Sequence, residues 1–355
     1  MFVGGAIVVV AKCPRSGHSK TRLSPLLGTE GAATLAQAML SDVLVSLSDY
    51  SQLEGTLKVL LYAPGTKEGE SHMISILQSL HLPFVATMTH CCSTDSSGGG
   101  GNDIALLLPL PILQTILTNN GWVLLPMKLS TSDSDLASSS LLGEILVDAL
   151  DKTRALLASL SKSSSSKVTP CTTSNNDAVL FLGMDSPELP LEEIVYGLQL
   201  SSGKEWRQHD AVINGVNNGK AHLCPANDGG YGLLSIPKHA PSLQIFSRVR
   251  WSHPLTAVSQ LKALTDCNVD VSIGTLMYDI DEPDDVHDLV KRLVQLNNRN
   301  SLSPFKSDQI SDPLTRLSAG ITNGGVTTED IQPILPRYTW RTLINLNLIK
   351  VDDKT

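Results

Sequence analysis

The chain has few aromatic residues, few cysteines and no apolar run of membrane-spanning length at its start. Phe, Trp and Tyr make up 4% of its 355 residues, and its six cysteines include no Cys-x-x-Cys pair. Cysteines spaced in this way predict neither a zinc motif nor a disulfide framework. The first apolar stretch ends at Lys12 and lacks the charged start of a signal peptide. We therefore expect a cytoplasmic protein without a membrane span, with import into an organelle left open.

Positive charge is scarce overall but concentrated in one loop. The formal net charge is -8, which argues against nucleic acid as the main partner. Four basic side chains nevertheless follow the apolar stretch at residues 6–11, namely Lys12, Arg15, Lys20 and Arg22. Such local charge predicts an anionic ligand, such as a phosphate, and the alternative is a solvated basic loop. A P-loop is disfavoured, because the stretch from Gly17 to Thr21 has no Gly directly before its lysine.

Apolar runs of strand length alternate with amphipathic segments of helix length over most of the chain. Helical spacing occurs at residues 29–48, 141–160, 191–200 and 283–296, and strand-like runs include residues 57–62 and 178–183. This alternation predicts an α/β fold with a sheet covered by helices on both faces.

The expected domain covers residues 1–300, and residues 301–355 form a C-terminal extension. Within that extension, residues 338–351 are expected to dock back as a helix or strand. Polar stretches near 91–103, 128–140 and 161–176 are rich in Ser or Gly, and we interpret them as surface insertions because the pattern resumes after each.

Acidic residues follow several of the predicted strands. Asp185 comes after the apolar run 178–183, where a carboxylate can hold a divalent cation or simply form a turn. Asp228 precedes Gly229 and Gly230 in a segment that suits either a ligand-binding loop or a hairpin turn.

A third acidic segment follows a strand expected at residues 269–277, while residues 246–251 are expected to form another strand or a turn. Asp279 and Asp281 would then lie on one face of the strand end. Two such carboxylates repel each other unless a metal, Lys or Arg lies between them.

Five motifs in this order resemble the glycosyltransferase-like DUF2064 family of the GT-A (nucleotide-diphospho-sugar transferase) superfamily. A more distant likeness is to 2-phospho-lactate and molybdenum-cofactor guanylyltransferases. The motifs are Lys12-Cys-Pro-Arg-Ser-Gly-His-Ser-Lys-Thr-Arg-Leu23, Leu182-Gly-Met-Asp-Ser-Pro187, Pro225-Ala-Asn-Asp-Gly-Gly-Tyr231, Trp251-Ser252 and Asp279-Ile-Asp-Glu-Pro-Asp-Asp285.

The resemblance implies a three-layer GT-A sheet and a metal–nucleotide site. It implies that the nucleotide is bound by Lys12, Arg15, Gly17, Lys20, Arg22, Gly229 and Gly230. Mg²⁺ or Mn²⁺ would be held by Asp185, Asp279 and Asp281, and Asp228 and Lys20 would be catalytic.

Three functions are therefore expected in turn. The first is metal-dependent glycosyl transfer from a nucleotide sugar to a small-molecule acceptor. The second is nucleotidyl transfer from a nucleoside triphosphate with release of pyrophosphate. The third is a catalytically inactive nucleotide-binding or scaffold protein, because Leu142-Gly-Glu-Ile-Leu146 stands where relatives commonly carry an Arg-Met pair.

Overall fold

The computed structural model describes residues 4–86, 109–127, 139–163, 178–203, 219–302 and 335–349. In these ranges the strands form one eight-stranded sheet in the order β3-β4-β2-β1-β5-β7-β6-β8. The strands are β1 (Ala6–Lys12), β2 (Leu57–Ala63), β3 (Phe84–Ala86), β4 (Trp122–Pro126), β5 (Val179–Gly183), β6 (Ala221–Pro225), β7 (Tyr231–Ile236) and β8 (Val271–Ile273). The helices are α1 (Ser24–Asp49), α2 (Lys67–Ser79), α3 (Leu110–Thr118), α4 (Ser139–Ser163), α5 (Leu191–Ser201), α6 (Ser242–Ser247), α7 (Thr256–Asp266), α8 (Pro283–Leu302) and α9 (Arg337–Asn345).

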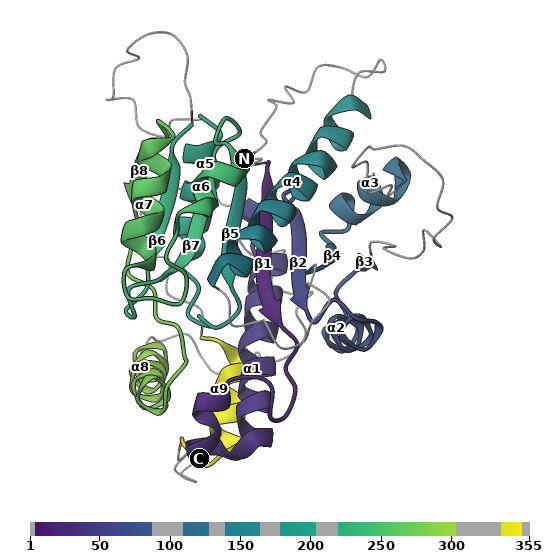
Figure 1. Ribbon diagram of the computed structural model, residues 1–355. Helices are drawn as coiled ribbons and strands as arrows, with labels where there is room; N and C mark the ends of the chain where they lie inside the picture. Colours follow the sequence, from purple (N-terminus) through teal and green to yellow (C-terminus); the bar gives the residue numbers. More distant parts are fainter. Residues whose placement is uncertain are drawn as a thin grey trace, which may run out of the picture.

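Helices cover both faces of this sheet, so the expected α/β architecture is confirmed (Figure 1). Val8 of β1 packs in the core formed with α3, α4, α6 and α7. Its neighbours Ile7 and Val9 pack on the opposite face, against α1, α2 and α5. Because successive strand side chains point to opposite faces, burial on both sides explains why β1 is continuously apolar.

Strand direction brings the ends of distant strands to one edge of the sheet. Strand β7 runs antiparallel to β5 and β6, whereas β1 is parallel to β2 and β5, and β6 is parallel to β8. The carboxyl ends of β1, β5, β6 and β8 therefore lie at the same edge. In an open α/β sheet this edge is where ligands usually bind.

A further layer covers the side of α1 that faces away from the sheet. Leu35 and Met39 of α1 pack with Leu289 of α8 and Leu343 of α9. The stretch Thr21–Asp49 is long and apolar enough to cross a membrane by length and composition, but 67% of its apolar window is buried in the protein. Packing on two sides accounts for its apolar character.

Several predicted element bounds were wrong. Residues 246–251 are not a strand, because α6 extends to Ser247 and turns follow it. Strand β8 ends at Ile273, so Asp279 and Asp281 lie in the segment beyond it rather than at a strand end.

The outcome for the polar insertions and the tail is mixed. Helix α4 already begins at residue 139 and ends at residue 163, inside two of the predicted insertions. The predicted insertion 91–103 lies outside the described residues, as do residues 128–138 and 164–176. Part of the C-terminal extension docks on α1 as helix α9, as one of the two alternatives expected.

Candidate functional site at the carboxyl edge of the sheet

Lys20 joins two carboxylates that come from distant parts of the chain. Its Nζ donates to Oδ2 of Asp185 at 2.6 Å and to Oδ1 of Asp281 at 2.5 Å. The Lys20 side chain is only 10% exposed, whereas the two carboxylates keep 30% and 41% of their surface. Burial alone would lower the pKa of Lys20, but the charges of Asp185 and Asp281 outweigh it and raise that pKa. Lys20 is therefore a charged group held between two acids.

The loop after β1 turns sharply in order to present Lys20. The buried Ser19 hydroxyl donates to the carbonyl of Cys13 at 2.7 Å and accepts from the backbone N–H of Arg15 at 3.0 Å. These two bonds close the loop on itself. Lys20 then adopts a left-handed conformation, with φ of 48°. Non-glycine residues rarely adopt this conformation, so the tight turn fixes the direction of the lysine.

Backbone hydrogen bonds tie the two acidic segments together. The N–H of Ile280 donates to the carbonyl of Asp185 at 3.2 Å, and the N–H of Met277 donates to the carbonyl of Pro225 at 2.8 Å. The segment 277–281 is thus held between the end of β5 and the end of β6. This bridging brings Asp281 within reach of Lys20.

Asp279 lies among the other carboxylates of this edge. Burial raises its pKa to about 6, and the charges of Asp228, Asp185 and Asp281 raise it further in the same direction. Four acids within electrostatic range of one another favour the binding of a cation. All four were predicted as site residues, and the structure brings them together.

The turn between β6 and β7 is a hairpin, as the alternative interpretation of this segment predicted. The Asp228 carboxylate accepts from the N–H of Gly230 at 2.7 Å. Gly229 has φ of 89°, and a Cβ at this position would lie 2.0 Å from the carbonyl oxygen of Pro254. Glycine is therefore required for the close approach of this turn to the segment before α7. The exposed Asp228 side chain stays available at the edge of the site.

The other basic residues of the loop are not brought to the carboxylates in the same way. Arg22 pairs with Glu282 at 3.2 Å, and both side chains are largely exposed. Lys12 is exposed at the end of β1. The charge of Arg15 acts on Cys13 and His72, which places it toward α2. Gly17 has φ of 74° and open space around it.

The carboxylates suit a divalent cation by their chemistry. Carboxylate oxygens are the ligands that Mg²⁺ and Mn²⁺ prefer. A cation, the Lys20 ammonium, already lies between Asp185 and Asp281. The residues therefore fit the expected ion, provided that Lys20 moves away from at least one of them. That Asp185, Asp279 and Asp281 bind a metal stays a prediction.

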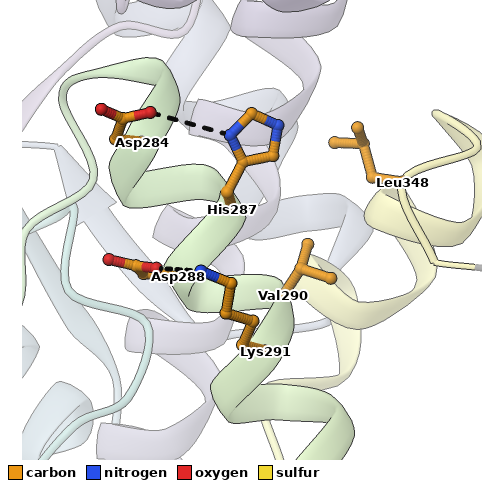
Figure 2. Close-up of a pocket in the computed structure, with 6 residues that line it drawn as sticks. All are labelled: Asp284, His287, Asp288, Val290, Lys291 and Leu348. Carbon is orange, nitrogen blue, oxygen red and sulfur yellow. Dashed lines mark hydrogen bonds and ion pairs between the residues drawn. The ribbon is translucent and has the colours of Figure 1, made fainter.

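An open pocket lies elsewhere, beside α8 and the segment after α9. Figure 2 shows its lining side chains, which are Asp284, His287, Asp288, Val290, Lys291 and Leu348. Its charged groups pair along α8, with Lys291 2.8 Å from Asp288 and His287 4.0 Å from Asp284. None of the side chains of the Lys20 cluster lines this pocket. We therefore base the functional interpretation on the carboxyl edge of the sheet.

Sequence reasoning missed a second polar cluster, formed by Glu193, His222 and Cys224. Their ligand atoms lie within 4.8 Å of one another, closely enough to hold a metal ion. The signal was the spacing of His222 and Cys224, since residues two apart in a strand share a face. Glu193 comes from another element and could not be associated with them from spacing.

Comparison with known proteins gives limited information. No family model and no curated protein matches the sequence. Among solved structures, the fold is similar to that of a protein from Desulfovibrio desulfuricans G20 that is provisionally assigned as a nucleotide-diphospho-sugar transferase. The TM-score is 0.47 at 18% sequence identity, over 86% of this chain and 92% of that chain. At this level of similarity, function has to be inferred from the side chains of the chain itself.

Proposed function

We propose that the protein is a metal-dependent transferase that uses an activated nucleotide, and that it transfers a glycosyl group from a nucleotide sugar to a small-molecule acceptor. The observation that carries this proposal is the meeting of Lys20 with Asp185 and Asp281 at the carboxyl edge of the sheet. A buried cation next to a group of acids is the arrangement that a metal–phosphate complex requires.

Asp185, Asp279 and Asp281 would hold the metal ion, and Mg²⁺ or Mn²⁺ would neutralise negative charge on the nucleotide phosphates. Lys20 would donate to a phosphate oxygen after leaving one of its carboxylates. Its charge would then stabilise the leaving phosphate where negative charge develops in the transition state. Lys12, Arg15 and the turn at Gly17 border the same loop and would extend the phosphate site.

Asp228 is proposed to act on the acceptor. Its carboxylate is exposed, and the N–H of Gly230 fixes its orientation. An ionised carboxylate in this position can accept the proton of an acceptor hydroxyl as that oxygen attacks the sugar. The backbone at Gly229 and Gly230 leaves room for donor or acceptor beside it.

The proposal is tested by binding and product analysis. A thermal-shift screen of nucleotides and nucleotide sugars, with and without Mn²⁺, first identifies the donor, because a ligand that binds the native state raises its stability. Calorimetry with that donor then compares the wild-type protein with Asp185→Asn and with Asp266→Asn, which changes an exposed acid paired with Lys262 on α7.

We expect Asp185→Asn to abolish Mn²⁺-dependent binding and Asp266→Asn to leave it intact. Unchanged affinity in Asp185→Asn would refute the metal assignment. Release of a nucleoside diphosphate supports glycosyl transfer. Release of pyrophosphate from a nucleoside triphosphate would reassign the same site to nucleotidyl transfer, and binding without any product would indicate an inactive nucleotide-binding protein.

A further inference from the structure

Three chemically distinct ligand groups meet on the face of the sheet covered by α5. Nε2 of His222 lies 2.6 Å from Oε2 of Glu193 and 3.7 Å from Sγ of Cys224. His222 and Cys224 are on β6 and have exposed fractions of 1% and 0%, whereas Glu193 is in the first turn of α5 and keeps 19% of its side-chain surface. The cluster is therefore closed on the protein side and reachable from solvent through Glu193.

Each of the three groups is oriented toward the same point. The N–H of Thr275 donates to Oε1 of Glu193 at 3.0 Å, which leaves Oε2 directed at the imidazole. Nδ1 of His222 is buried and has no hydrogen-bond partner among the described residues, so Nε2 carries the polar contacts of the ring. The ring of Tyr196 packs edge-on against His222, with centroids 5.1 Å apart, and limits its rotation.

Gly274 keeps the space between the three groups open. A Cβ at this residue would lie 2.6 Å from Sγ of Cys224, 2.7 Å from Nε2 of His222 and 2.8 Å from Oε2 of Glu193. The absent side chain therefore marks a point almost equidistant from sulfur, nitrogen and oxygen donors. The N–H of Gly274 donates to the carbonyl of Leu223 at 2.8 Å, which fixes this part of the chain against β6.

We propose that Glu193, His222 and Cys224 form a zinc site, separate from the nucleotide site, with an open fourth position for water. Thiolate, imidazole and carboxylate are the three ligand types of protein-bound zinc, and three protein ligands with one open position are typical of accessible zinc sites. The charges also balance, because one thiolate, one carboxylate and a neutral imidazole compensate one divalent cation.

The observed spacing agrees with this assignment. Zn–N and Zn–S bonds of about 2.0 and 2.3 Å at a tetrahedral angle separate the two donor atoms by about 3.5 Å. His222 and Cys224 are 3.7 Å apart. The contact between His222 and Glu193 is that of a hydrogen bond and would open slightly as the ion replaces the shared proton. Without a cation, burial and the charge of Glu193 raise the pKa of the Cys224 thiol to about 12.

Cobalt substitution tests the site directly. The full-length protein is stripped with a chelator, kept reduced with a phosphine, and titrated with Co²⁺, whose bond to a thiolate gives a charge-transfer band in the near ultraviolet. We expect this band in the wild-type protein and its displacement by Zn²⁺. Cys224→Ser should lose the band, whereas Cys267→Ser should keep it, because Cys267 lies outside the cluster. Asp185→Asn should also keep it, since that change affects only the nucleotide site.

Two further variants keep the test decisive if Cys224→Ser does not fold. Glu193→Gln changes a partly exposed ligand, and Gly274→Ala keeps all three ligands but fills the space between them. We expect both to reduce the zinc that remains bound after dialysis, from about one ion per chain in the wild-type protein. Absence of a cobalt band in the wild-type protein, or persistence of the band in Cys224→Ser, would overturn the proposal.

Discussion

Nζ of Lys20 lies 2.6 Å from Oδ2 of Asp185, although 165 positions separate the two residues in the sequence. The same ammonium is 2.5 Å from Oδ1 of Asp281, so one lysine neutralises two acids at once. Its position is the one that a divalent cation between these acids would take. Lys20 and a metal ion should therefore compete for the carboxylates, and a phosphate offers the lysine a new partner.

Lys20→Ala should separate these two roles. A hydrogen bond to a charged group contributes about 1.5–3 kcal/mol, so loss of the contact to phosphate should lower kcat/KM roughly ten- to a hundredfold. Affinity for Mn²⁺ in the absence of nucleotide should rise, because no ammonium occupies the carboxylates. Steady-state kinetics with the identified donor and calorimetry with Mn²⁺ measure the two effects. Lys262→Ala is the control, since this exposed lysine pairs only with Asp266 on its own helix. Weaker Mn²⁺ binding in Lys20→Ala would argue against competition.

Gly229→Ala should be far more damaging than Gly17→Ala. Both glycines have positive φ, but a Cβ at Gly229 would collide with the backbone of Pro254, whereas a Cβ at Gly17 has open space around it. Strain alone costs about 1–2 kcal/mol at each position. The additional collision should make the loss at Gly229 clearly larger and displace the turn that carries Asp228. Urea unfolding of the two variants measures the difference, and equal losses would contradict the close approach to Pro254.

Stability should increase with pH because of one buried lysine. Lys58 of β2 is fully buried and donates to the side chain of Asn120. Burial lowers its pKa from 10.5 to about 8, against the opposing charge of Glu54. Between these two values the unfolded state binds more protons than the folded state, so the free energy of unfolding rises with pH. Below about pH 8 the lysine is protonated in both states and this dependence disappears.

Lys58→Met tests the origin of that dependence. Urea unfolding at several pH values between about 7 and 10 should show rising stability in the wild-type protein and a flatter profile in the variant. Asn120 loses a partner in the variant, which lowers stability at every pH without changing the slope. An identical slope in both proteins would assign the effect to other groups.

Asp42→Asn should loosen α9 from the rest of the fold. The Asp42 carboxylate of α1 accepts from the backbone N–H groups of Tyr338 and Thr339, at 2.9 and 2.7 Å. These donors belong to the first turn of α9, so the side chain acts as a cap supplied by another helix. Weakening such a cap costs about 1 kcal/mol. Hydrogen exchange within α9 should accelerate more than exchange in the sheet, whereas Glu30→Gln on the exposed side of α1 should leave both unchanged.

Much of the fold could be predicted from local patterns. The apolar run of β1 and the helical spacing of α1, α4 and α5 each depend on residues close together in sequence, and these elements were found near their expected bounds. The patterns failed where a tertiary contact decides the conformation. Strand β8 is only three residues long, because pairing with β6 ends at Ile273.

The sequence by itself determined that this is an α/β protein with one basic loop and several acidic segments after its strands. Only the tertiary structure decided which of these charges meet. Lys20 reached Asp185 and Asp281, while Arg15 lies toward α2 and Arg22 pairs with Glu282 in solvent. Likewise, Glu193 joined His222 and Cys224 because α5 packs on β6. The reason is physical: periodicity reports which face a residue occupies on its own element, whereas contacts between elements depend on how the whole sheet is ordered and covered.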